Sequence, residues 1–118
     1  MCELRDVVEK LILFKAEDTA FKLLKTMAKF ANNYKHHEDL GINFLFLNKV
    51  EEATKYFELA VSVCDNSEDL YYLRNSLIKL YIESKNFSKA KIYIEINKKI
   101  KSSPELQYYS NLLNGKNG

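Results

Sequence analysis

Three alanines recur in the same sequence context along this chain, and their spacing is the feature that most constrains the fold. They stand at Ala20, Ala53 and Ala90, 33 and then 37 residues apart. Large apolar residues stand four residues after, ten residues after and thirteen residues before each alanine: Leu24, Phe57 and Ile94; Phe30, Val63 and Ile100; Val7, Leu40 and Leu77. A spacing of four places side chains on one helix face. A small residue followed by a large one at this spacing therefore indicates two helices that cross closely.

Each repeat is predicted to be a pair of helices joined by a short turn. Upstream of each alanine, another pair of residues has helical spacing. Val8, Gly41 and Ile78 are each followed three residues later by a large apolar residue: Leu11, Phe44 and Tyr81. One pair of helices cannot bury its apolar face alone, so successive pairs are expected to stack. We therefore expect one all-α domain over residues 1–118, with about seven helices in units at about 1–33, 34–67 and 68–103 and a final helix at about 104–114.

The stretch IYIEI at residues 92–96 tests this interpretation, because its isoleucines alternate with other residues as in a strand. Short apolar runs are ambiguous by period alone. Ala90 places the stretch in phase with the second helices of the other two units, which predicts a helix here.

Turn and cap residues agree with the predicted boundaries. Asn48 is suited to the left-handed conformation that ends the first helix of unit two. Asn66 and Asn86 are predicted N-caps of the two helices of unit three. The sequence Ser103-Pro104-Glu105 gives an N-cap, a proline at the first helical position and an acid in the first turn, which predicts the start of the final helix.

Composition excludes several classes of protein. Only 3 Gly and 1 Pro occur in 118 residues that are 47% hydrophobic, which favours helices over a sheet with many tight turns. Cys2 and Cys64 form no closely spaced pair, so free thiols are expected. The N-terminus MCELRDVVEKLILFK carries acids among its apolar residues and is neither a signal peptide nor a membrane span. We expect a cytoplasmic protein that does not insert into membranes.

No residue pattern predicts catalysis, a cofactor or a metal site. His36 and His37 are adjacent and point in different directions on a helix, and there is no phosphate-binding loop or nucleophile motif. We therefore expect no enzyme.

Charge is distributed unevenly, although the net charge is only +2. Residues 38–69 hold 2 basic and 8 acidic residues, or −6, and residues 70–118 hold 9 basic and 3 acidic residues, or +6. A nucleic-acid surface is one interpretation of the lysines near the C-terminus, but no aromatic-rich stacking surface is expected to accompany them, so a solvated face is favoured. The opposite charges could also steer a partner or pair copies of the chain.

The repeats resemble the tetratricopeptide repeat (TPR) family. Unit two gives the best match, with His37-x2-Leu40-Gly41-x2-Phe44 followed by Ala53-x3-Phe57. Units three and one match more loosely: Arg74-x2-Leu77-Ile78-x2-Tyr81 then Ala90-x3-Ile94, and Leu4-x2-Val7-Val8-x2-Leu11 then Ala20-x3-Leu24. The family's tryptophan position is never filled, and its closing proline is replaced by Asn32, Asp65 and Ser102.

The resemblance implies a right-handed α-solenoid of antiparallel helix pairs, which holds a protein or peptide partner in a concave groove lined by the first helix of each pair. Carried over by motif position, the groove candidates are Arg5, Glu9, Ile12, Glu38, Ile42, Leu45, Tyr72, Asn75, Lys79 and Ile82. The positions at which some family members clamp a terminal carboxylate include Glu9 and Asp39 here. These acids would repel a carboxylate, which disfavours chaperone-tail binding.

The expected function is non-enzymatic protein–protein interaction through an aliphatic strip of Ile12, Ile42, Leu45 and Ile82. Core packing alone is another interpretation of Ile42, Leu45 and Phe46. An alternative function is self-assembly as a homo-oligomer, or a scaffold part of a larger protein, because the chain closes as LLNGKNG, which is typical of a turn before a further helix. Nucleic-acid binding is less favoured.

Overall fold

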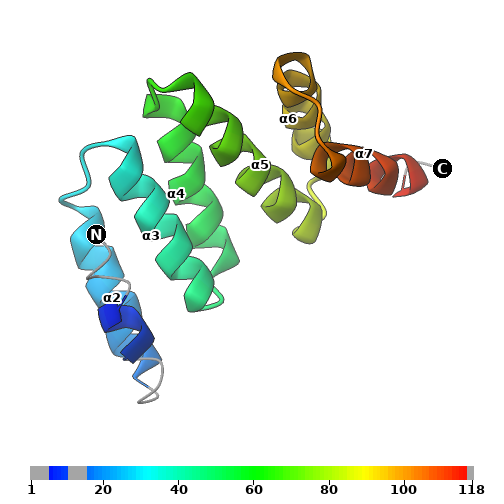
Figure 1. Cartoon of the computed structure of the whole chain (residues 1–118). Helices are drawn as coiled ribbons and strands as arrows, with labels where there is room; N and C mark the ends of the chain where they lie inside the picture. The colour runs from blue at the N-terminus through cyan, green and yellow to red at the C-terminus, as the bar shows by residue number, and fades with distance from the viewer. Residues whose placement is uncertain (1–5, 11–15, 117–118) are drawn as a thin grey trace. The chain divides into compact units, whose positions relative to one another are not determined.

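The computed structural model describes residues 6–10 and 16–116, and every regular element in these ranges is a helix. Residues 6–10 are helical. The remaining helices are α2 (Glu17–Ala28), α3 (Tyr34–Phe46), α4 (Val50–Val63), α5 (Ser67–Glu83), α6 (Phe87–Ile100) and α7 (Pro104–Lys116), as Figure 1 shows. The all-α prediction is confirmed for the described residues, and IYIEI lies inside α6.

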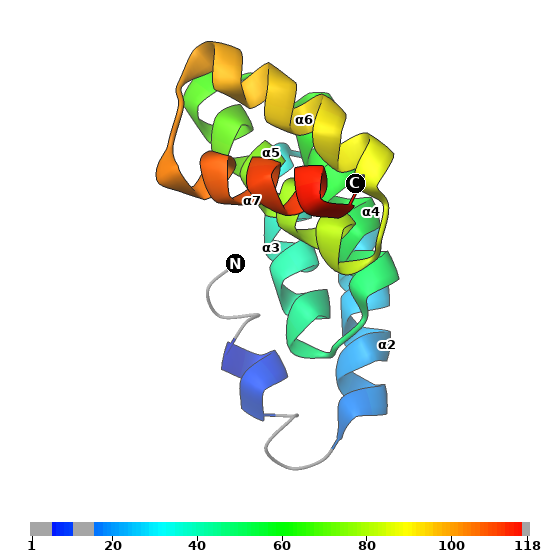
Figure 2. The same ribbon diagram turned by 90° about the vertical axis from the view of Figure 1, so that its right-hand side faces the viewer.

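The chain divides into two compact units, Met1–Cys64 and Asp65–Gly118. In the first unit α3 and α4 pack side by side as a helical hairpin, and α2 packs on α3 (Figure 1). In the second unit α5 and α6 form a hairpin, and α7 packs against both of its helices; α6 and α7 run beside each other in Figure 2. The division lies close to the predicted boundary between units two and three.

The three alanines occupy the same place in their helices. Each is 0% exposed, and the large residue four positions later is also buried: Leu24 at 0%, Phe57 at 3% and Ile94 at 2%. Each alanine amide donates to the carbonyl of its helix N-cap residue: Ala20 to Ala16 (3.1 Å), Ala53 to Lys49 (3.0 Å) and Ala90 to Asn86 (3.2 Å). The prediction that these alanines are equivalent is confirmed.

The turn between α3 and α4 has the hydrogen bonds of a Schellman motif. The Asn48 amide donates to the Leu45 carbonyl and the Lys49 amide to the Phe44 carbonyl, both at 2.9 Å. Asn48 has φ 60°, as predicted, and asparagine tolerates this left-handed conformation better than most residues. The motif satisfies the last carbonyls of α3, and α4 begins at Val50, after a turn of three residues.

The turn between α5 and α6 repeats this motif 37 residues later, without any glycine or asparagine at its left-handed position. Lys85 has φ 63°. Its amide donates to the Ile82 carbonyl (3.1 Å), and the Asn86 amide donates to the Tyr81 carbonyl (2.7 Å). Asn86 is the N-cap residue of α6, as predicted, but its side chain makes no capping hydrogen bond.

The predicted caps of the other two helices are confirmed by direct contacts. The Asn66 side chain accepts a hydrogen bond from the Asp69 amide (2.9 Å) at the start of α5. The Ser103 hydroxyl accepts one from the Leu106 amide (3.1 Å) at the start of α7. The end of α7 differs from the prediction, because the helix continues through Gly115 to Lys116 where LLNGKNG predicted a turn.

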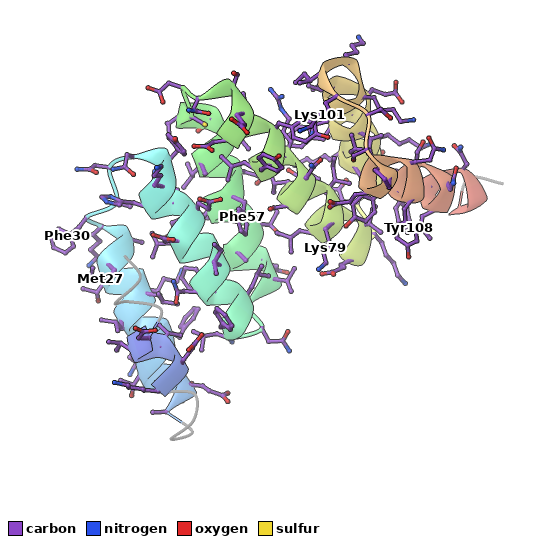
Figure 3. All side chains as sticks on the ribbon, in the orientation of Figure 1. Met27, Phe30, Phe57, Lys79, Lys101 and Tyr108 are labelled. Carbon is purple, nitrogen blue, oxygen red and sulfur yellow. The ribbon has the colours of Figure 1, made fainter. Side chains whose placement is uncertain are left out.

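Two of the aligned apolar positions are not buried in every repeat. Val7 was aligned with the buried Leu40 and Leu77, but it is 45% exposed and its neighbour Val8 is buried in the core of the first unit. Ten residues rotate a helix by about 280°, so Val63 and Ile100, the last residues of α4 and α6, leave the buried face, and Phe30 lies two residues beyond the end of α2. These residues are indeed exposed: Phe30 (70%), which points outward in Figure 3, Val63 (52%) and Ile100 (59%).

Aromatic rings fill the core of the first unit. The Phe44 ring stacks on Tyr56, with centroids 5.3 Å apart, and meets Phe21 edge-on at 5.8 Å. Leu24 and Leu40 are fully buried in the same cluster. This packing joins α2, α3 and α4 into one body.

At Gly41, α3 packs tightly against α4. A methyl group added there would lie 2.9 Å from two carbons of the Phe57 ring, which is 3% exposed. The equivalent positions in the second unit hold Ile78 and Ile94, both buried. In the second unit, Ile78 thus stands in place of Gly41, and the smaller aliphatic side chain of Ile94 stands in place of the Phe57 ring.

We predict that Gly41→Ala lowers the free energy of unfolding. Overpacking against Phe57 costs about 1–3 kcal/mol, which outweighs the gain of about 0.5–1 kcal/mol from replacing glycine in a helix. Urea unfolding followed by circular dichroism measures the change, and the cost of Gly41→Ala should be smaller in a Phe57→Leu background.

The control is Gly115→Ala in α7, where an added methyl group meets no atom within 4 Å. This variant should be stabilised rather than destabilised. Equal effects of the two substitutions would show that α3 and α4 do not approach closely at Gly41.

Candidate functional site

The predicted groove residues belong to the first helices of the repeats, and the structure describes eight of the ten. Arg5 and Ile12 lie outside the described residues. Glu9 is half-buried in the helical segment 6–10. The remaining candidates lie on α3 in the first unit and on α5 in the second.

On α3 the buried and exposed apolar residues separate as the helical period predicts. Leu40 and Phe44 are fully buried, so the side of α3 that they occupy is used by the core. Ile42 is half-buried, and Leu45 and Phe46 are 37% and 40% exposed. These three side chains form a partly exposed apolar patch, and the half-buried candidate Glu38 stands one helical turn before Ile42.

On α5 the candidates are spread along the helix. Tyr72, near the start, is 50% exposed. Lys79 is exposed and projects from α5 in Figure 3. Ile82, in the last turn, is half-buried.

A hollow of about 220 Å³ lies beside Ile82, in the second unit. Its lining comes from the end of α5, the turn after it, the start of α6, and α7: Ile82, Glu83, Lys85, Phe87, Leu112 and Leu113. The contribution of Leu112 and Leu113 was missed, because the sequence alone does not show that α7 packs against both helices of the hairpin. Four of these residues are apolar, and the exposed Glu83 and Lys85 add one acid and one lysine.

Tyr109 of α7 lies near the same acid. Burial raises the pKa of its phenol, and Glu105, which hydrogen-bonds to it, and Glu83 raise that pKa further. These effects favour the protonated phenol, whose O–H group can donate a hydrogen bond to the Glu105 carboxylate.

Asn75 is a wrong groove prediction, because its side chain is buried. It is 8% exposed, and its Oδ1 accepts a hydrogen bond from Asn97 Nδ2 at 2.8 Å. Asn97 is fully buried in α6 at the position that Ala60 fills in α4, and its Nδ2 also donates to the Tyr71 carbonyl (3.0 Å). A buried amide must find partners, so Asn75 serves the hairpin and cannot contact another molecule.

A second hollow, of about 370 Å³, lies where α5 begins and α6 ends. It is lined by Ser67, Glu68, Tyr71, Ile100 and Lys101. The Lys101 ammonium lies 5.0 Å from the Tyr71 ring centroid and 5.4 Å from that of Tyr72. The expectation that no aromatic surface accompanies the C-terminal lysines is therefore wrong at Lys101, since these tyrosines are distant in sequence. The ammonium covers the rings, which does not favour stacking by a base.

In the described ranges, no group of three or more His, Cys, Asp or Glu side chains could hold a metal ion. Within the same ranges, no helix is both long enough and apolar enough to span a bilayer. Searches of protein-family models, curated proteins and solved structures give no match to this chain.

His37 is a titratable side chain packed in the first hairpin. Its ring stacks on Tyr56 with centroids 6.4 Å apart, and its buried Nδ1 has no hydrogen-bond partner. Burial lowers the pKa of His37 below its usual value of 6.5, and the neighbouring His36 lowers it further. The folded chain therefore resists protonation at this ring.

We predict that part of the stability is lost as the pH falls below 6.5, the usual histidine pKa. Between this value and the lowered folded pKa the unfolded chain binds more protons, so the free energy of unfolding rises with pH. His37→Phe, which keeps a ring beside Tyr56, should flatten the dependence measured by urea unfolding across this range. An unchanged slope in the variant would contradict the assignment.

We predict that Asn75→Ala lowers the free energy of unfolding by about 1–3 kcal/mol, because it removes one of the two acceptors of the buried Asn97 amide and leaves only the Tyr71 carbonyl. Lys79→Ala, on the exposed side of the same helix, is the control and should change it by less than about 0.5 kcal/mol. Thermal unfolding followed by circular dichroism separates the two. If both substitutions changed the free energy of unfolding by the same small amount, the Asn75 side chain would not be a buried hydrogen-bond partner.

Proposed function

We propose that the chain is a non-enzymatic interaction module of TPR type, whose helical hairpins stack as a solenoid and hold a segment of a partner protein along their first helices. The single observation that carries the proposal is the repetition of one hairpin design in both units, with partly exposed apolar side chains on each first helix. Repeat proteins of this design present such helices as an extended binding surface.

The apolar side chains of α3 support an anchor site for a partner. Ile42 and Leu45, together with Phe46, are partly exposed although Leu40 and Phe44 already supply the core face. An extended or helical segment with apolar side chains at intervals would bury this surface.

The hollow beside Ile82 supports a second anchor site. Its volume of about 220 Å³ suits one side chain, and its rim of Glu83 and Lys85 would contact a polar segment on either side of that anchor. The partner segment is therefore expected to carry spaced apolar residues and charges of both signs.

We predict that Ile42→Asp combined with Leu45→Asp abolishes partner binding while the helical content stays unchanged. Aspartate in place of two partly exposed aliphatic residues removes the apolar contact and adds two negative charges. Proteins captured from the source cell by the unaltered chain and lost by the variant are identified by mass spectrometry. Binding of the purified partner is then measured by calorimetry.

Two control variants make this test specific. Leu59→Asp alters an equally exposed leucine on a second helix, at 37%, and should leave binding unchanged. Ile82→Asp should weaken it. Binding that survives changes at both first helices would reject the groove, and loss with Leu59→Asp would place the contact on the second helices.

A further inference from the structure

Helix α6 exposes three isoleucines in one line. Ile92 is 58% exposed, Ile96 is 37% exposed and Ile100 is 59% exposed. They are four residues apart, so they share one face of the helix. We call these three residues the isoleucine stripe.

The repeat itself does not require apolar residues at these positions. The equivalent residues of the two preceding second helices are Lys55, Leu59 and Val63 in the α4 repeat and Lys22, Thr26 and Phe30 in the α2 repeat. A lysine thus occupies the first position twice and a threonine the second position once. Only α6 has an aliphatic residue at all three, which points to a contact particular to this helix.

Charges along the edge of the stripe indicate what covers it. Glu95 is the only acid in α6, and it stands four residues before Lys99, on the same edge. Beyond this edge, farther from the stripe, lies α7: Lys98 stands about 60° from Glu95 around the helix, and its Nζ is bound to Ser110 of α7 at 3.0 Å. A second α6 laid antiparallel would place Ile96 opposite Ile96 of the second copy. Glu95 would then lie about 3 Å along the axis from Lys99 of that copy, and the reverse pair would form by symmetry.

We propose that the isoleucine stripe is a self-association surface, on which α6 of a second copy of this chain packs antiparallel about a two-fold axis. Ile92 then faces Ile100 of the second copy, and two symmetric Glu95–Lys99 pairs fix the direction. The antiparallel order also opposes the dipoles of the two helices. Three side chains from each copy make a small interface, so the dimer is weak and forms at high micromolar concentration. This surface is separate from the first helices, so it does not depend on the proposed groove.

Sedimentation equilibrium of the full chain over a range of concentrations tests the surface. The unaltered chain should show a monomer–dimer equilibrium, and Ile96→Asp should weaken it at least tenfold, since it places two carboxylates together on the axis. Leu59→Asp is the matched control, because Leu59 has the same 37% exposure at the equivalent position of α4. A chain that stays monomeric throughout overturns the proposal. Equal loss with Leu59→Asp also overturns it, because it would place α4 in the interface.

Cysteine cross-linking tests the antiparallel direction. In a chain with Cys2 and Cys64 replaced by serine, Ile96→Cys should form a disulfide-linked dimer under mild oxidation. Ile92→Cys alone should not, because the two copies of residue 92 would be about 12 Å apart along the axis. A mixture of Ile92→Cys and Ile100→Cys chains should form the mixed dimer. Efficient self-linking of Ile92→Cys would indicate parallel helices and overturn the arrangement, as would an Ile96→Cys yield no higher than that of Leu59→Cys.

Discussion

The burial of a small side chain in the first turn of the second helix is the packing constraint that both hairpins share. Ala53 and Ala90 are completely buried in the first turns of α4 and α6. Gly41 brings α3 within van der Waals reach of the Phe57 ring. Such contacts allow the two helices to be joined by a turn of three residues, and this turn needs a left-handed residue to satisfy the last carbonyls of the first helix. The Schellman motifs at Asn48 and Lys85 follow from that requirement.

The two hairpins differ in the kind of side chain that is buried between their helices. The first has Ala60 where the second has Asn97, whose amide is bound to Tyr71 and Asn75. A buried polar group of this kind adds a directional requirement to the fit of α5 against α6, because its hydrogen bonds form in one register only. The first hairpin relies instead on stacked aromatic rings, Phe44 against Tyr56. The apolar residues left outside differ as well: they lie on the first helices, where we place a partner, and on α6, where we place a second copy.

The local features could be predicted from the sequence because each depends on a few neighbouring residues. The register of the alanines, the left-handed Asn48 and the caps at Asn66 and Ser103 are of this kind. Lys85 was not predicted to be left-handed, since lysine has no preference for that conformation and only the hairpin imposes it.

Features that join distant residues could not be predicted. Asn75 matched a groove position by motif, yet Asn97, 22 residues later, draws it into the core. Lys101 reaches Tyr71 and Tyr72, and α7 completes the hollow beside Ile82, only because the hairpin folds back on itself. The surface candidates Ile42, Leu45 and Ile82 followed from helical spacing, and the structure leaves all three partly exposed.

The proposed function requires that the repeated hairpins stack into one scaffold rather than act as two separate bodies. Residual dipolar couplings of the backbone amides in solution test it most directly, because they report the orientation of each helix in a common frame. The couplings of α3 and α4 and those of α5 and α6 are expected to fit one alignment tensor of the same magnitude and direction. Two tensors of different magnitude would mean that the hairpins reorient independently, which would contradict a continuous groove.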